Sequence, residues 1–316
     1  MKETKQNIEQ LLKDRPELFL IIQILNGSNQ NLSDSIPLPP LKKGELDLDE
    51  FIRLVKHHRL DSILYREIVL QNIDLPSELK QKLEQINKRN KMRMLKLTSE
   101  LIRIHQLFTE NNIDYISLKG PALSQQIYGD YTIRNSRDLD ILIRIEDLDK
   151  ANFLLNKIEY TTDVINFKKY QKAFHAIEYI NKERKIKLEI HTRFFSFNKL
   201  YEYHENEIFE NKETIIINND SINILNKKRN SDFLYMHAKK HSWELFYWIA
   251  DLIKLEYDKE ELINDFLINQ QKNKRDSHFS FLIYTLSLNK TINHKINVIK
   301  IYYIRFINWA KNKLFQ

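Results

Sequence analysis

In one short segment of the chain, two arginines and two aspartates lie directly before and within an apolar run. Residues 134–145 read RNSRDLDILIRI, so Asp138 and Asp140 alternate with aliphatic residues that run from Leu139 to Ile145. In a β-strand, alternate side chains point to opposite faces, so the two aspartates share one face about 6.5–7 Å apart and the aliphatic residues share the buried one. Carboxylate oxygens suit Mg²⁺ or Mn²⁺. The spacing predicts a metal-binding site on the exposed face of a half-buried strand, although an isolated D-x-D pair also occurs by chance.

A second predicted strand repeats this design. Residues 185–194 read KIKLEIHTRF and follow a strand at 173–180 and the polar turn NKER, a pattern typical of a β-hairpin. Glu189 and His191 lie on the charged face of this strand. If it neighbours the first strand, Glu189 becomes a third carboxylate, and a divalent ion would relieve the repulsion among the three. Taken alone, Glu189 is better explained as an ordinary surface charge of a hairpin.

A third motif is suited to binding an anion. In SLKGPALSQQIYGD, residues 117–130, a strand ends, Lys119 and Gly120 follow, and Pro121 occupies the first position of a predicted helix. Backbone N–H groups at a helix N-terminus favour anions, and a glycine allows a phosphate to approach the backbone closely. The spacing differs from that of a Walker A loop, and a plain strand-to-helix turn is the alternative.

The order of these motifs resembles the nucleotidyltransferase superfamily of DNA polymerase β type. It is more closely similar to the uncharacterised nucleotidyltransferase family (NTP_transf_5), whose pattern runs LKG, Y, R-x-x-G-D-[IL]-D-[LI]-L and then [DE]-[LI]-H. The resemblance covers about residues 50–260. The matching positions are Lys119, Gly120, Arg134, Asp138, Asp140, Glu189 and His191.

This resemblance implies a metal-dependent nucleotidyltransferase that moves a nucleoside monophosphate from an NTP to a hydroxyl or phosphate acceptor and releases pyrophosphate. It implies that Asp138, Asp140 and Glu189 are the catalytic residues and the ligands of Mg²⁺ or Mn²⁺. The residues expected to contact the NTP are Lys119, Gly120, Arg134, Arg137 and His191. The base of the NTP and the acceptor, whether a small molecule, a peptide or RNA, stay open.

Two positions depart from the family pattern. The glycine-serine pair usual in the superfamily reads Gly120-Pro121, so no serine hydroxyl is available there for a phosphate. Arg137 replaces the glycine that usually precedes the first aspartate, and it either clamps a phosphate or crowds the site. Both departures concern triphosphate binding and leave the metal site intact.

The distribution of charge keeps two further functions open. The net charge of the chain is +7, and residues 271–316 contain nine Lys or Arg and one acidic residue. A basic tail of this kind could bind RNA, which would make the protein an RNA-modifying nucleotidyltransferase toxin with salt-sensitive binding. A general richness in lysine is the alternative explanation. The third possibility is a non-catalytic scaffold that binds nucleotide.

A segment near the C-terminus adds to the resemblance. Residues 231–255 are predicted as one helix, similar to the family's H-x-x-x-H-x-W…W-x-x-D segment. Its positions 237, 241, 244, 248 and 251 form a single stripe that reads His, His, Glu, Trp and Asp. The stripe either closes over the catalytic face or packs Trp248 into the core with the histidines at its edge. Zinc is disfavoured, because Ala238 follows His237 and the H-E-x-x-H pattern is absent.

The elements that must position these residues indicate an α+β fold with a small mixed β-sheet between helical regions. Residues 1–95 are predicted to be helical, with a helix broken by Pro16 and a linker at 26–45. Residues 96–200 form the predicted nucleotidyltransferase core, and residues 201–316 a mainly helical domain with the basic tail.

The composition of the chain excludes several classes of protein. The absence of cysteine excludes disulfides, cysteine metal sites and a cysteine nucleophile, and it favours a cytoplasmic location. The charged N-terminal segment lacks the apolar core of a signal peptide, and no uncharged apolar run is long enough to span a bilayer.

Overall fold

The computed structural model describes residues 16–26, 46–195, 205–241 and 244–256. They fall into two compact units, of which the second comprises residues 61–63 and 84–234 and the first the remaining described residues. The expected basic tail at 271–316 and nearly all of the expected linker at 26–45 lie outside the described residues. Among the described helices, none is long and apolar enough to cross a membrane.

The first unit is built from helices. It contains α2 (Pro16–Asn26), α3 (Leu48–His57), most of α4 (Asp61–Leu70), the start of α5 (Ser77–Glu110), the end of α10 (Lys227–Lys240) and α11 (Phe246–Lys254). The residues after the expected linker, predicted to be helical up to residue 95, form α3, α4 and most of α5. Arg59 and Asn72, at φ 55° and 51°, lie between these helices, where left-handed backbone turns the chain.

Pro16, the residue expected to break the N-terminal helix, is the first residue of α2. Residues 1–15, where the part before the break would lie, are outside the described residues. Proline suits the first position of a helix because its fixed φ is already helical and its missing N–H would have no partner in the first turn.

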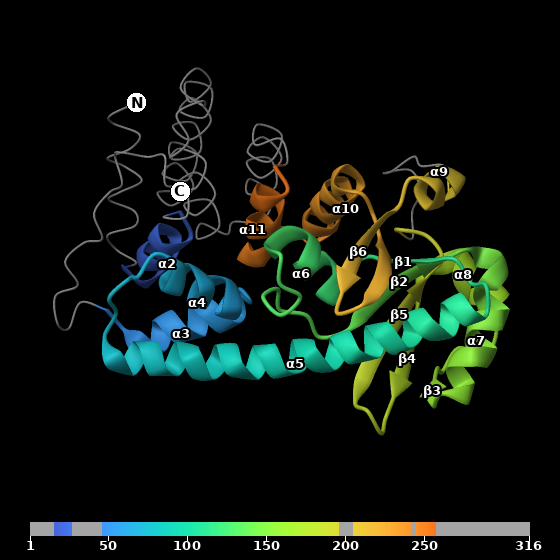
Figure 1. Cartoon of the computed structure of the whole chain (residues 1–316), viewed down its shortest axis with the longest axis horizontal. Coiled ribbons are helices and arrows are strands. Elements are labelled where there is room, and N and C mark those ends of the chain that lie inside the picture. The colour runs from blue at the N-terminus through green and yellow to red at the C-terminus, as the bar shows by residue number, and fades with distance from the viewer. Residues whose placement is uncertain (1–15, 27–45, 196–204, 242–243, 257–316) are drawn as a thin grey trace, which may run out of the picture. The chain divides into compact units, whose positions relative to one another are not determined.

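The second unit is organised around a mixed sheet of seven strands in the order β3-β4-β5-β2-β1-β7-β6 (Figure 1). The β2–β5 and β1–β7 pairs are parallel, and the other pairs are antiparallel. The strands are β1 (Tyr115–Ser117), β2 (Leu139–Ile143), β3 (Tyr160–Thr161), β4 (Ala176–Asn181), β5 (Ile186–His191), β6 (Glu213–Ile217) and β7 (Asp220–Ile224). The expected α+β fold with a small mixed sheet is confirmed.

The sheet extends beyond residue 200, where the sequence analysis ended the mixed-sheet core. The β6–β7 hairpin adds two strands, with Asn218 at φ 56° in its turn. Two runs rich in isoleucine around an Asn-Asn pair are a recognisable hairpin signal, because asparagine tolerates the left-handed conformation that tight turns require. The general abundance of Asn and Ile in the chain obscured this signal.

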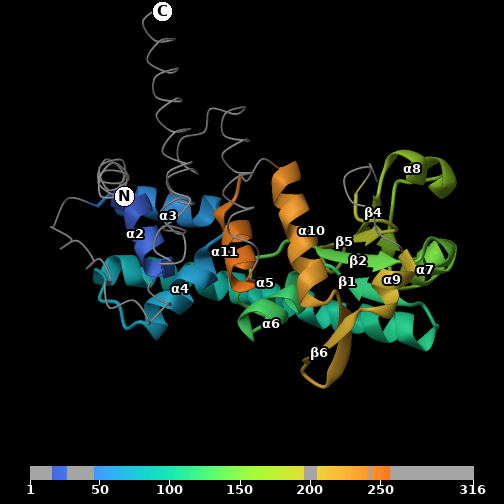
Figure 2. The same cartoon turned by 90° about the horizontal axis from the view of Figure 1, so that it is seen from above.

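Helices lie against both faces of this sheet. They are α5, α6 (Gly120–Tyr128), α7 (Leu148–Lys157), α8 (Phe167–Ala173), α9 (Glu205–Glu210) and the start of α10 (Lys227–Lys240), with a short 3₁₀ turn at Ile145–Asp147. Tyr179 of β4 donates to Asn152 of α7 at 3.2 Å, and Tyr160 of β3 donates to Glu100 of α5 at 3.1 Å. Figure 2 shows α8 beside β4, and β4, β5, β2 and β1 in succession.

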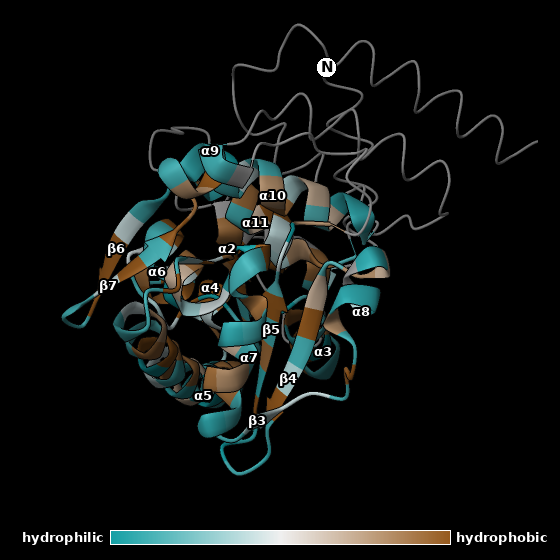
Figure 3. Ribbon diagram, turned by 90° about the vertical axis from the view of Figure 1, so that its right-hand side faces the viewer, coloured by the Kyte–Doolittle hydropathy of each residue, from teal (hydrophilic) through white to brown (hydrophobic). Residues whose placement is uncertain are grey.

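The alternation of strand residues decides which face is buried. Figure 3 shows hydrophobic and hydrophilic residues alternating along β4 and β5, in agreement with their burial. β2 differs, because all five of its residues are buried. Ile145, expected to lie on the buried face of that strand, is 52% exposed because β2 ends at Ile143 and the chain turns into the 3₁₀ segment.

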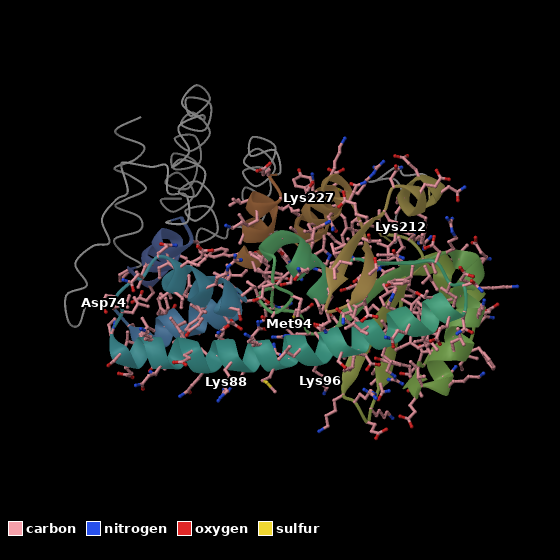
Figure 4. The ribbon with its side chains drawn as sticks, viewed as in Figure 1. Asp74, Lys88, Met94, Lys96, Lys212 and Lys227 are labelled. Atoms are coloured by element: carbon pink, nitrogen blue, oxygen red, sulfur yellow. The ribbon has the colours of Figure 1, made fainter. Side chains whose placement is uncertain are left out.

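We predict that Met94 of α5 is important for stability, whereas Met92 is not. Met94 is fully buried and Met92 is 62% exposed, and Figure 4 shows Lys88 and Lys96 on the side of α5 opposite to Met94. Met94→Ala should lower the free energy of unfolding by about 2–5 kcal/mol through the lost contacts and the cavity. Met92→Ala should change it by less than about 0.5 kcal/mol. Urea denaturation of the two variants measures both, and equal losses would contradict the prediction.

Candidate active site

The candidate site is positioned by the pairing of β2 with β5. The two strands run parallel, and Asp140 pairs with Glu189 while Ile141 pairs with Ile190. Paired residues on neighbouring strands point to the same face, so the two carboxylates lie side by side. The condition that the sequence analysis placed on Glu189, namely that its strand neighbours the first one, is therefore met.

Asp140, Glu189 and His191 form a close cluster on this face. His191 Nε2 lies 3.2 Å from Asp140 Oδ1 and 3.4 Å from Glu189 Oε2. One ligand atom from each of the three residues lies within 4.8 Å of the others, which makes them the group in the described part of the chain that could hold a metal ion. Lys119 Nζ contacts the same Asp140 oxygen at 3.1 Å.

Burial and opposite charges together set the ionisation of this cluster. Burial alone raises the pKa of the Asp140 carboxyl, but the charge of Lys119 and the contact with His191 outweigh it and hold that pKa well below its usual range. The contact with His191 likewise lowers the pKa of Glu189, in spite of burial. Burial lowers the pKa of His191, but its bonds to both carboxylates raise it above the usual value. Each group is therefore stabilised in its charged form.

Asp138 lies outside this close cluster. It is half-buried and directly precedes β2, two residues before Asp140. The cluster of three potential ligands contains His191 in the place where the sequence analysis expected Asp138. The assignment of Asp138 as a metal ligand thus stays a prediction.

The Lys119-Gly120 turn has the conformation that its sequence indicates. Lys119 is the N-cap residue of α6, Pro121 follows within the first turn, and Gly120 has a left-handed φ of +67°. A Cβ at Gly120 would lie 3.6 Å from a Leu139 methyl group and 3.7 Å from the Asp138 carbonyl oxygen. The turn therefore lies against the start of β2, where only glycine adopts this φ without strain.

The two arginines expected to contact phosphate differ in burial. Arg134 is 1% exposed, and its backbone N–H donates to Ser124 Oγ at 2.9 Å. Arg137, which replaces the family's glycine, is exposed. A buried guanidinium binds phosphate only where the phosphate reaches it, so the role of Arg134 stays a prediction, as does that of Arg137.

The structure adds neighbours to the site that the sequence analysis did not assign to it. Glu178 of β4 pairs directly with Glu189 and accepts from Lys187 at 2.9 Å. The ring of His175 lies 5.4 Å from that of His191. Counting outward from the expected NKER turn at 181–184 would place Glu178 opposite Lys187. The turn instead comprises residues 182–185, because Asn181 pairs with Ile186, and this shift of register places Glu178 opposite Glu189.

Comparison with known families decides the class of this protein. A family described as "Uncharacterised nucleotidyltransferase" (NTP_transf_5) matches residues 44–288, well over half of the chain. The chain belongs to this family. It is therefore a transferase of nucleotidyl groups (EC 2.7.7 type), as the order of its motifs indicated.

Several solved structures resemble parts of this nucleotidyltransferase, and no curated protein matches it. The lincosamide antibiotic adenylyltransferase LnuA, lincomycin-bound, is 18% identical with a TM-score of 0.37, over 50% of this chain and 95% of its own. An antigenic nucleotidyltransferase-like protein from Paracoccidioides brasiliensis is 16% identical with a TM-score of 0.35, over 59% and 92%. The antibiotic-resistance factor ANT(2'')-Ia is 11% identical with a TM-score of 0.33, over 69% and 99%.

The histidine-tryptophan stripe of the nucleotidyltransferase belongs to the first unit. Residues 231–255 were predicted as one helix, and this is wrong, because α10 ends at Lys240 and α11 begins at Phe246. The rings of His237, His241 and Trp248 nevertheless gather at 4.8–5.7 Å from one another.

The burial of this stripe agrees with a core role. Trp248 is 5% exposed, and Asp251 is fully buried. Among the described residues, neither His237 nor His241 joins a group of three potential metal ligands. Closure of the stripe over the catalytic face stays a prediction.

We predict that Lys119 and Asp140 depend on each other for stability. Their side chains are 13% and 3% exposed, and removal of one partner from a buried ion pair commonly costs about 3–5 kcal/mol. Lys119→Met should therefore destabilise the apo protein by about that amount, and Asp140→Asn should recover part of the loss in the double variant. Lys96→Met, at an exposed position of α5, serves as the control. Denaturation in EDTA is measured for the wild type, the two single variants, the double variant and the control, and additive losses would show that the pair is not coupled.

Proposed function

We propose that this nucleotidyltransferase moves a nucleoside monophosphate from an NTP to a hydroxyl or phosphate group of an acceptor, releases pyrophosphate and depends on a divalent metal ion. The observation that carries the proposal is the parallel register of Asp140 with Glu189. It holds two carboxylates side by side, with Lys119 and His191 in contact with Asp140.

The donor set fits a divalent ion. Asp140, Glu189 and His191 offer two carboxylate oxygens and one imidazole nitrogen within 4.8 Å of one another, and Asp138 would add a third carboxylate. Carboxylates suit Mg²⁺ and Mn²⁺, and an imidazole is better accommodated by Mn²⁺. Bound there, an ion would neutralise negative charge on the phosphate oxygens of the NTP.

The Lys119-Gly120 turn supports binding of the triphosphate. The N-terminus of α6, which begins at Gly120, presents backbone N–H groups and the positive end of the helix dipole. Pro121 removes one of these N–H donors, so the charge of Lys119 becomes more important. Lys119 has three N–H donors, so it can contact a phosphate oxygen as well as Asp140. Arg134 and Arg137 are proposed as further phosphate ligands.

Glu189 is proposed as the general base. Its side chain is 35% exposed, and its lowered pKa keeps it ionised at neutral pH. It accepts the proton of the acceptor hydroxyl, the oxygen forms a bond to the α-phosphorus, and the bond from that phosphorus to pyrophosphate breaks. Before a metal ion binds, His191 Nε2 lies 3.4 Å from Glu189 Oε2 and orients this carboxylate.

Binding of the four common NTPs with Mg²⁺, followed by calorimetry, tests the proposal. We expect one or more to bind to the wild type, with binding lost in Asp138→Asn/Asp140→Asn because the carboxylates that hold the ion are gone. The transfer rate should fall by about 10²–10⁴-fold in Asp140→Asn, the effect of losing several kcal/mol of electrostatic stabilisation. Circular dichroism checks that the variants are folded. Unchanged transfer by Asp140→Asn would overturn the catalytic assignment.

We expect Gly120→Ala and Gly129→Ala to affect stability equally but nucleotide binding differently. Both glycines have a left-handed φ, +67° and +68°, so alanine should cost about 1–2 kcal/mol at either position. Only Gly120 lies beside the proposed phosphate site, where an added methyl group hinders close approach. Thermal unfolding and NTP calorimetry on both variants measure the two effects, and equal NTP binding by the two would count against a phosphate site at Gly120.

A further inference from the structure

A pocket opens in the second unit between the end of β3, α8 and β4. Its volume is about 720 Å³, and it is lined by residues that lie between Thr161 and Lys182. Pockets that bind small molecules usually measure about 300–1,000 Å³. The proposed chemistry does not yet use this pocket, which has room for a small organic molecule.

The pocket lies on the same face of the sheet as the catalytic carboxylates. Glu178 lines it and pairs with Glu189 in the antiparallel β4–β5 ladder. Side chains opposed in this way share a face, with Cβ atoms about 4.5–5.5 Å apart. Ile180 also lines the pocket and lies on this face, whereas Tyr179 between them points towards α7. The lining residue Glu178 is therefore the direct cross-strand neighbour of Glu189.

The walls of the pocket expose apolar surface. The rings of Tyr170 and Phe174 stack with centroids 4.5 Å apart, and Phe174 is 50% exposed. Ile165, on the loop before α8, is 99% exposed. The Phe174 carbonyl accepts from Arg193 at 3.2 Å, which ties the end of α8 to the chain directly after β5. Exposed aromatic surface in a concave site is typical of recognition of a flat apolar group.

The charges of the lining residues balance. Asp163 and Glu178 are acidic, and Lys169 and Lys182 are basic. Glu178 is also paired with Lys187 at 2.9 Å. A site for an RNA strand would need an excess of positive charge along the phosphate backbone. The pocket therefore favours a ligand of small net charge.

We propose that this pocket binds the acceptor of the transfer reaction, and that the acceptor is a small hydroxyl-bearing molecule with an apolar ring. The proposal rests on the proposed function. The ring lies against Phe174 and Tyr170, and the hydroxyl reaches Glu189. Glu189 takes the hydroxyl proton, the oxygen bonds to the α-phosphorus of the NTP, and pyrophosphate leaves.

The experiment uses the full chain and an α-³²P-labelled form of the NTP that binds to it. The labelled NTP and Mg²⁺ are incubated with the small-molecule, RNA and protein fractions of a cell extract. We expect label in the small-molecule fraction, and about 10-fold less with Phe174→Ala, the effect of losing one aromatic contact. Phe153→Ala, at a 59% exposed phenylalanine of α7, is the matched control and should label like the wild type.

A second pair of variants tests whether a loss of labelling with Phe174→Ala could come from misfolding. Ile165→Asp places a charge on an apolar wall of the pocket, so it should lower the labelling by a similar factor. Because this side chain is 99% exposed, the substitution should not affect the fold. Ile145→Asp, at a 52% exposed isoleucine away from the pocket, is its control.

Each outcome bears on the proposal. Labelled small molecules that decrease with Phe174→Ala and Ile165→Asp, while NTP binding is unchanged, support it. Label in RNA or protein overturns it, as does small-molecule labelling that neither variant changes. No label in any fraction, with NTP binding intact, also overturns it. If the wild type binds no NTP at all, the proposed function is refuted instead.

Discussion

The parallel pairing of β2 with β5 is the constraint on which the candidate active site depends. It places Asp140 and Glu189 at paired positions, so their mutual repulsion cannot be relieved by separating the strands without breaking the ladder. Lys119 and His191 compensate through contacts of 3.1–3.4 Å. Because an uncompensated buried charge costs several kcal/mol, these carboxylates need cations on this face, either from the chain or from a bound ion. A surface that holds positive charge next to two carboxylates carries groups of both signs, which the proposed metal ion and triphosphate would require.

The position of the Lys119-Gly120 turn is tied to the same strand β2. Leu118 N–H donates to the Asp140 carbonyl at 2.9 Å, so the strand that precedes the turn is tied to the residue that Lys119 neutralises. The left-handed Gly120 then turns the chain into α6, directly beside the start of β2. The helix N-terminus and the carboxylates therefore come from segments that are hydrogen-bonded to each other. Pro121 follows Gly120 within the first turn of α6 and supplies no hydroxyl there.

One face of the sheet in the second unit packs against helices, and the opposite face carries the candidate site and the pocket. On β4, Tyr179 points to α7 and is fully buried, whereas its neighbours Glu178 and Ile180 line the pocket on the opposite face. Period-two alternation thus lets one short strand anchor the core on one face and extend the face of the candidate site on the other. The stacked Tyr170 and Phe174 show that α8 leaves apolar surface open on that face instead of burying it. Exposed aromatic surface beside polar chemistry is retained most readily where a ligand covers it.

The sequence by itself determined the residue types, the alternation of the two charged strands and the Lys119-Gly120 helix start. These are local properties, since strand period and glycine conformation depend on near neighbours in the chain. It also indicated the family, because the motifs follow one another in a recognisable order. Only the tertiary structure decided that His191 joins Asp140 and Glu189 in the close cluster, that Arg134 is buried while Arg137 is exposed, and that β6 and β7 extend the sheet. It alone placed Glu178, which lines the pocket, opposite Glu189. The physical reason is that contacts between residues dozens of positions apart depend on strand register and packing, which no local pattern specifies.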